Sequence, residues 1–375
     1  NSNVLVVRVN RHGGYDRPMT LEFARYVDDQ LGEPELGAEG KDFWHRYAFP
    51  DGFAYALYGI VAEGEVAKAE TGSGEFYDIE ARTGWEIRNG RRGMKIWEVE
   101  LRLPERKATL TFSPEVASVT LYVGIATTKE TGDPLARTQA LAQAAAQKGY
   151  DAIYAAHRAW WEAFWRRSSL VLSDRMVETL WYQGLYVLAC QSRGTMPPSL
   201  VGPGYYHPHA GWRGLIHTDF NIQMMYWPTY ASNHMDLGLV YYDFFYRHRG
   251  TMKEDTQAIY QIDGIKFPGL TDGTGRELAY IGCRTWMCVS AWCAQLYWWG
   301  YEYTQDREFL RQIAYPIMRE VAKFYRAYAI KGDDGKYHIF PSTAPEQSPW
   351  WATDPAIDIA LICVHMQATL QASEL

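Results

Sequence analysis

Four polar side chains with catalytic potential lie close together in residues 217–228, which read HTDFNIQMMYWP. They are one acid, two amides and one imidazole: Asp219, Asn221, Gln223 and His217. In an extended or turning segment, the acid and the amides alternate on one side of the backbone, over an apolar opposite side. Such a polar face could meet a ligand. A buried turn in which Asp219 and Asn221 only bond backbone amides fits the spacing equally well.

A second carboxyl group lies in the proline-flanked loop 340–349, next to two tryptophans. The group is Glu346. A carboxylic acid beside apolar rings is poorly solvated when ionised, which favours the protonated form that a general acid needs. Inverting glycoside hydrolysis requires an acid and a base whose carboxyls are roughly 6.5–9.5 Å apart, and Glu346 with Asp219 could supply both. The alternative is an ordinary surface glutamate.

Aromatic residues make up 15% of the chain, with 15 Trp and 27 Tyr. Their rings can stack on sugars, but they serve equally well in cores and protein interfaces. The loop 204–214 holds three glycines and a proline, so we expect an irregular segment there. We predict that substrate is bound by the following residues near the two carboxyl groups: Tyr206, Trp212, His217, Gln223, Trp227 and Trp350.

Several other classes of function find little support. A net charge of −7 and a pI near 5.8 argue against a nucleic-acid partner. The apolar runs at 286–301 and 356–364 are too short to span a bilayer, so we expect no membrane segment. The glycine-rich loop 269–277 lacks a phosphate-binding motif. The five cysteines form no CxxC, so we predict buried free thiols, no metal and no cofactor.

The elements that must position these residues change character along the chain. Residues 1–130 contain short, often alternating β segments and predict an antiparallel β-sandwich domain. Residues 131–172 are alanine-rich and predict a linker of one or two helices. Residues 173–375 predict successive long helices without intervening strands, which is typical of a toroid of helical hairpins. The predicted elements are strands at 4–9, 52–58, 95–103, 108–112 and 118–125, and helices at 174–193, 235–262, 284–303, 306–330 and 354–373.

Four motifs resemble those of glycoside hydrolase family 95, in the same order and at similar spacing from about residue 115 to the end. They are VLACQSRGTMPPSLVG at 187–202, HTDFNIQMMYWP at 217–228, YTQDREFL with AYPI at 303–317, and PSTAPEQ at 341–347. The resemblance implies an N-terminal β domain, a helical linker and an (α/α)6 barrel. It also implies an inverting exo-glycosidase that removes α-L-fucosyl or α-L-galactosyl groups from oligosaccharides or polysaccharides.

By this resemblance, Glu346 is the general acid, and Asp219 and Asn221 occupy the positions of two asparagines that hold the attacking water. Three features depart from the family. Asp219 replaces an asparagine, the loop 271–277 lacks the His/Asn-bearing segment that lines the sugar pocket, and the downstream catalytic aspartate is not in this chain. Only about half of the barrel helices are expected here, so we predict that the C-terminal half of the same protein is the partner that covers their apolar faces.

Two other classes of function remain open. A polysaccharide lyase on a helical toroid would use Tyr205, Tyr206, His207 or His217, with a basic pocket for which Arg213 is the one candidate. A catalytically inactive carbohydrate-binding homologue is compatible with aspartate at position 219. An enzyme that acts on extracellular glycans would be secreted or periplasmic, although the first residues carry no signal peptide.

Overall fold

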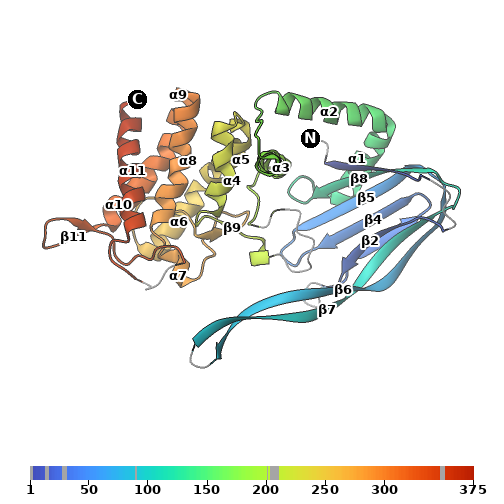
Figure 1. Cartoon of the computed structure of the whole chain (residues 1–375), viewed down its shortest axis with the longest axis horizontal. Helices are drawn as coiled ribbons and strands as arrows, with labels where there is room; N and C mark the ends of the chain where they lie inside the picture. Colours follow the sequence, from blue (N-terminus) through green and yellow to red (C-terminus); the bar gives the residue numbers. More distant parts are fainter. Residues whose placement is uncertain are drawn as a thin grey trace. The chain divides into compact units, whose positions relative to one another are not determined.

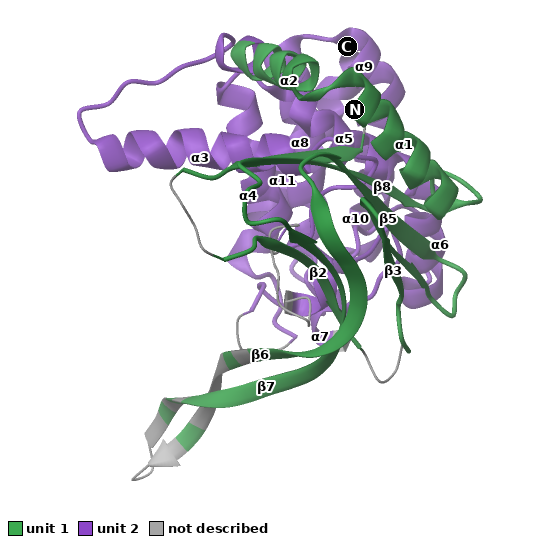
Figure 2. Ribbon diagram, turned by 90° about the vertical axis from the view of Figure 1, so that its right-hand side faces the viewer, with its two compact units in different colours: residues 1–162 green, residues 163–375 purple. Residues whose placement is uncertain are grey.

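The computed structural model describes residues 3–12, 17–27, 32–88, 91–200, 202, 211–346 and 351–375. The chain divides into two compact units, residues 1–162 and 163–375, which are coloured separately in Figure 2. Each unit is described by itself below. The boundaries predicted at residues 130 and 172 stay a prediction.

The first unit contains two antiparallel sheets. The five-stranded sheet has the order β1-β8-β5-β4-β3, and the three-stranded sheet has the order β2-β7-β6. The strands are β1 (Val4–Asn10), β2 (Thr20–Tyr26), β3 (Glu35–Glu39), β4 (Asp42–Ala48), β5 (Ala54–Glu63), β6 (Val66–Arg88), β7 (Arg91–Phe112) and β8 (Ser118–Thr127). Antiparallel β structure in this part of the chain was predicted and is confirmed.

The prediction of separate strands at 95–103 and 108–112 is wrong, because both belong to β7. Pro104 lies between them. Pairing with β2 ends at Glu105, and just beyond it the Val27 amide donates to the Pro104 carbonyl at 2.6 Å, so Pro104 lies at the end of the β2 ladder with β6 on its other side. A proline is tolerated at such an edge because its missing N–H leaves no ladder bond unmade.

The apolar core of the first unit is built from both sheets. Phe43 and Val61 contribute from the five-stranded sheet, and Leu110 and Phe112 from the three-stranded sheet. Phe23 stacks on Phe43 with ring centroids 3.8 Å apart. Alternate residues of a strand face the same side, so each strand supplies the core with every second side chain.

Two helices follow the sheets, as predicted. They are α1 (Pro134–Lys148) and α2 (Tyr150–Trp165). The Asp133 side chain accepts a hydrogen bond from the Ala136 amide and caps α1. Gly149 separates the helices with a φ of 80°, a left-handed conformation that glycine adopts without strain.

The second unit is mainly helical (Figure 1). Its helices are α3 (Arg175–Gln191), α4 (Asn221–Ala231), α5 (Met235–Arg247), α6 (Arg249–Tyr260), α7 (Ile281–Arg284), α8 (Cys288–Thr304), α9 (Arg307–Phe309), a π-helical turn (Leu310–Ala314), α10 (Tyr315–Tyr328) and α11 (Ala356–Glu374). Short strands pair as β9 (Ile216–His217) with β10 (Leu270–Thr271), and as β11 (Ile330–Lys331) with β12 (Tyr337–His338). The helix predicted at 235–262, with a possible break near Gly250, does break there, at His248, whose φ and ψ are −90° and 10°.

Helix α8 packs against α4, α10 and α11 of the second unit. Val289, Leu296 and Tyr297 on this helix are fully buried. The Tyr241 hydroxyl donates to the Cys293 carbonyl at 3.0 Å, and the Tyr297 hydroxyl donates to the Tyr242 carbonyl at 3.0 Å. These bonds satisfy hydroxyl groups that would otherwise be costly to bury.

Two expectations about this unit need correction. The thiols of Cys283, Cys288 and Cys293 are free and buried, but Cys190 and Cys363 are free and exposed. The apolar run at 356–364 was expected to be too short for a membrane. It continues through the whole of α11, which is long and apolar enough to cross one by length and composition alone, with 33% of that stretch buried in the structure.

Gly59 in β5 offers a test of how the core is packed. A Cβ at this position would overlap the buried ring of Phe43, so we expect Gly59→Ala to destabilise the protein by about 1–3 kcal/mol. Gly72 in β6 is the matched control, because a Cβ there meets nothing and alanine should be neutral or slightly stabilising. The measurement is urea denaturation. Equal effects of the two substitutions would contradict the packing described here.

Candidate functional site

Residues 217–228 fold as a strand end, a turn and a helix. His217 ends β9 opposite Leu270, and α4 begins at Asn221. The predicted alternation of polar and apolar sides is therefore wrong: Phe220 is exposed, and Gln223 is completely buried. Side chains in a helix repeat every 3.6 residues and not every two. Pro228 lies inside α4.

The turn is held by bonds to the neighbouring stretch of chain. The Thr218 amide donates to the Gly269 carbonyl at 3.1 Å. The Thr218 hydroxyl donates to the carbonyls of Pro268 and Gly269. The Gln223 amide group donates to the Thr218 carbonyl at 2.7 Å. Gln223 was predicted to bind substrate, but its position under the turn makes it a support of the turn in this structure.

Asp219 is a buried carboxyl group, with its side chain 7% exposed. Burial raises its pKa to about 6, the hydrogen bond to its own backbone opposes the shift, and the charge of Glu346 adds to it. Its Oδ1 atom has no hydrogen-bond partner in the described part of the chain. A buried carboxyl group of this kind changes its charge close to neutral pH, which is common at functional sites.

His217 lies beside this carboxyl group, with Nδ1 at 3.9 Å from Oδ1 of Asp219. Burial lowers the pKa of His217, although a backbone bond at Trp212 and the charge of Glu346 oppose that effect. Its Nε2 atom is also buried without a partner among the described residues. A neutral imidazole and an ionisable carboxyl group therefore share the turn.

Glu346 is exposed and has a left-handed backbone, with a φ of 58°. The apolar surroundings predicted for this side chain are thus not found among the described residues. Trp350 lies outside the described residues, and Trp351 is exposed. The negative charge of Glu346 contributes to the raised pKa of Asp219 and of Tyr280 and opposes the lowering of the His217 pKa, so the four groups lie in one region of the second unit.

Aromatic rings surround the start of α4. Phe220 stacks on Trp292 with centroids 5.8 Å apart, and Trp292 is followed by Trp227 at 6.4 Å. The indole nitrogen of Trp227 is buried without a partner among the residues that the structure describes. Trp212 is 69% exposed, and its ring lies 6.2 Å from that of His217. Of the other predicted residues, Asn221 is half-buried at the start of α4, whereas Tyr206 lies outside the described residues.

Tyr280 is a member of this region that the sequence did not reveal. A side-chain hydrogen bond with Cys283 is the largest of the effects that raise its pKa to about 12, and the charges of Glu346 and Asp219 contribute. Tyr280 is 63% exposed, so it could contact a ligand. No motif marks it, because it is distant in sequence from both carboxyl groups. Phe220 lay inside the predicted segment but was assigned to its apolar side.

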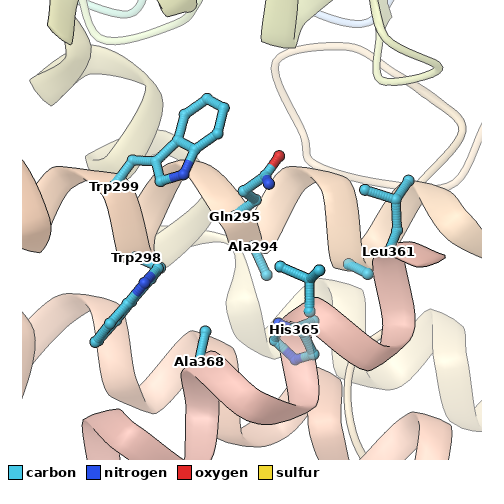
Figure 3. Close-up of a pocket in the computed structure, with 9 residues that line it drawn as sticks. Ala294, Gln295, Trp298, Trp299, Leu361, His365 and Ala368 are labelled. Carbon is cyan, nitrogen blue, oxygen red and sulfur yellow. The ribbon is translucent and has the colours of Figure 1, made fainter.

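The remaining features do not point to a bound ion. Among the described residues, no group of three or more His, Cys, Asp or Glu side chains could hold a metal. A small hollow lies between α8 and α11 (Figure 3). Figure 3 shows residues that line it, among them Trp298 and Trp299 of α8 and His365 and Ala368 of α11. None of the predicted site residues lines this hollow.

Known proteins resemble this chain in both sequence and fold. It is 29% identical to alpha-L-fucosidase 2 of Arabidopsis thaliana over 175 residues, 46% of this chain and 21% of that protein. It is 25% identical to the kojibiose hydrolase of Flavobacterium johnsoniae over 228 residues, 59% of this chain and 32% of that protein. The chain thus spans less than a third of the length of these relatives.

The fold resembles that of a human-microbiome protein described as a candidate kojibiose phosphorylase. The TM-score is 0.71 at 11% sequence identity, over 98% of this chain and 47% of that one, which is a likeness of fold alone. Residues 150–375 match the glycosyl hydrolase family 95 catalytic domain, a region that includes both carboxyl groups of the site. With that match over more than half of its residues, the chain belongs to glycosyl hydrolase family 95.

Proposed function

We propose that the protein is an inverting exo-glycosidase that removes terminal α-L-fucosyl groups, or the related α-L-galactosyl groups, from glycans. Glu346 protonates the glycosidic oxygen as the general acid. Asp219 and Asn221 hold the attacking water on the opposite face of the sugar. The fucosidase among the relatives and the family membership support this substrate class.

The raised pKa of Asp219 carries the mechanistic part of the proposal. With a pKa of about 6, Asp219 is ionised at neutral pH and can accept a proton from water. Glu346 is exposed and lies within electrostatic reach of Asp219, so it can approach the leaving-group oxygen from another direction. A buried base and an exposed acid in one region are the two groups that inversion requires.

The larger architecture is also part of the proposal. We propose that the helices of the second unit belong to an (α/α)6 toroid and that the two sheets of the first unit form a β-sandwich. The fold likeness to a longer protein, of which this chain covers 47%, supports this view. A role in the use of extracellular glycans would place the protein outside the cell or in the periplasm.

A second candidate substrate is kojibiose, because one relative is a kojibiose hydrolase and matches more of this chain than the plant fucosidase does. Both candidates use the same acid and the same water. They differ in the sugar that occupies the pocket. Incubation with fucosylated oligosaccharides and with kojibiose, followed by separation of the products, distinguishes the two.

The role of Glu346 can be tested by Glu346→Gln, which removes the transferable proton. We expect the rate on unactivated fucosylated oligosaccharides to fall by about 100-fold or more, because general acid catalysis contributes on that order. NMR should show β-L-fucose as the first product of the unsubstituted protein. Glu302→Gln changes another exposed glutamate, at the end of α8, and should leave the rate unchanged. Full activity of Glu346→Gln, or release of the α-anomer first, would refute the mechanism.

The burial of Asp219 should also appear in the pH dependence of stability. An unfolded aspartate has a pKa near 3.8 and folded Asp219 a pKa of about 6, so the folded protein binds the proton more tightly. Stability therefore falls as the pH rises from about 4 to 6, and the whole penalty is present above 6. We expect Asp219→Asn to raise the free energy of unfolding by on the order of 1–2 kcal/mol at neutral pH, and not at pH values below the unfolded pKa.

Chemical denaturation across this pH range measures the effect. Asp333→Asn, in an exposed turn, is the matched control and should not change stability in a pH-dependent manner. A stabilisation by Asp219→Asn that is the same at acidic and neutral pH would contradict the raised pKa. The same substitution should abolish any activity that depends on ionised Asp219.

A further inference from the structure

Glu346 lies in the segment between Ser342 and Ala352. A short main-chain bridge joins the two ends of this segment, which we call its root. The Ser342 amide donates to the Ala352 carbonyl at 3.0 Å, and the Ala352 amide donates to the Ser342 carbonyl at 2.6 Å. Next to this bridge, the Trp351 amide donates to the Thr343 hydroxyl at 3.1 Å. The two ends of the segment are therefore fixed to each other, and Glu346 lies between them.

The bridge is attached in turn to the chain that precedes α8. The Thr343 amide donates to the Thr285 carbonyl at 3.0 Å, and the two threonine hydroxyls are 3.0 Å apart. Thr343 and Ser342 are completely buried. The root of the segment is thus part of the packed interior, although Glu346 itself is exposed.

Asp358, in the first turn of α11, joins these parts. Its side chain is completely buried. Its Oδ1 atom accepts a hydrogen bond from the Cys288 amide at 2.9 Å, at the start of α8, and its Oδ2 atom accepts one from the Ser342 hydroxyl. No side chain adjacent in sequence caps α8, so Asp358 supplies the cap from another helix. A carboxylate is favourable at a helix N-terminus because of the helix dipole.

Burying the Asp358 carboxyl group lowers the stability of the folded protein. No lysine, arginine or histidine among the described residues forms an ion pair with Asp358. Burial raises the pKa of this carboxyl group, although its bonds with Ser342 and Cys288 oppose the shift. An amide or an apolar residue could fill the same space without the cost of burying a carboxyl group. A carboxylate differs from these residues because both of its oxygens accept hydrogen bonds. One bond comes from the start of α8 and the other from the root of the Glu346 segment.

We propose that Asp358 is a positioning residue for the general acid. By holding Ser342 and the start of α8 together, it sets the place of the bridge and so of Glu346. The inference rests on the proposed role of Glu346. Proton transfer requires the acid within hydrogen-bond reach of the glycosidic oxygen, so a shift of the root by about 1 Å should cost up to about 100-fold in rate.

The test is Asp358→Asn, assayed on two substrates. Asparagine keeps one oxygen for the Cys288 amide but replaces the other with an NH2 donor. The Ser342 hydroxyl can then no longer donate to residue 358 and keeps only the Thr285 carbonyl, at 3.2 Å, as its acceptor. On an unactivated fucosyl disaccharide, we expect kcat to fall by about 10- to 100-fold with little change in KM. On an aryl α-L-fucoside with a good leaving group, the rate should stay within about 3-fold, because such a group departs with little help from an acid.

Two further variants make the outcomes distinguishable. Thr369→Val is the structural control: Thr369 is buried on the same helix, and its hydroxyl bonds the His365 carbonyl, far in sequence from the bridge. It should affect both substrates equally. Glu346→Gln is the reference for loss of the acid. If it keeps full activity on the disaccharide, the proposed function fails. If it loses that activity while Asp358→Asn affects both substrates equally, or neither, the positioning role is overturned.

Discussion

A buried ion pair holds the stretch of chain on which the Asp219 turn depends. Lys266 and Glu277 pair at 3.3 Å with side chains 1% and 4% exposed. Glu277 also accepts from the amides of Gly269 and Ala279. These bonds fix Gly269, whose carbonyl anchors the turn before Asp219. Removing one partner of such a pair leaves an uncompensated buried charge, so the loop 269–277 has a clear structural task. Its glycine-rich sequence had raised the question of phosphate binding.

The buried carboxyl groups of the second unit differ in whether they have an ion-pair partner. Glu277 has a cation and backbone amides as partners, which compensate for its desolvation. Asp219 and Asp358 have no ion-pair partner within 3.5 Å among the described residues, and burial raises the pKa of both. Unpaired buried carboxyl groups lower stability and are retained where they have a task. The charge of Glu346 acts on Asp219, and Asp358 supports the segment that carries Glu346.

The aromatic residues also divide into two sets. The tyrosines packed around α8 are buried, and their hydroxyls bond backbone carbonyls; they are Tyr230, Tyr241, Tyr242, Tyr297 and Tyr325. Their number reflects the construction of the helical core. A smaller set near the turn, Phe220, Trp227, Trp292 and Trp212, is partly or largely exposed. The aromatic content of the sequence therefore overestimates the number of rings that a sugar can reach. Only the exposed rings near the turn can stack on a sugar.

The sequence by itself determined the order of β and helical parts, most helix positions and the family, because periodicity, capping residues and contiguous motifs are local properties. It also singled out Asp219 and Glu346. Only the tertiary structure decided that α4 begins at Asn221, that Gln223 is buried and that Glu346 is exposed. It alone brought Tyr280 within electrostatic reach of the two carboxyl groups, and Asp358 to Ser342 at the root of the segment that carries Glu346. Solvation and electrostatic coupling depend on which distant segments meet, and no local pattern in the chain records that.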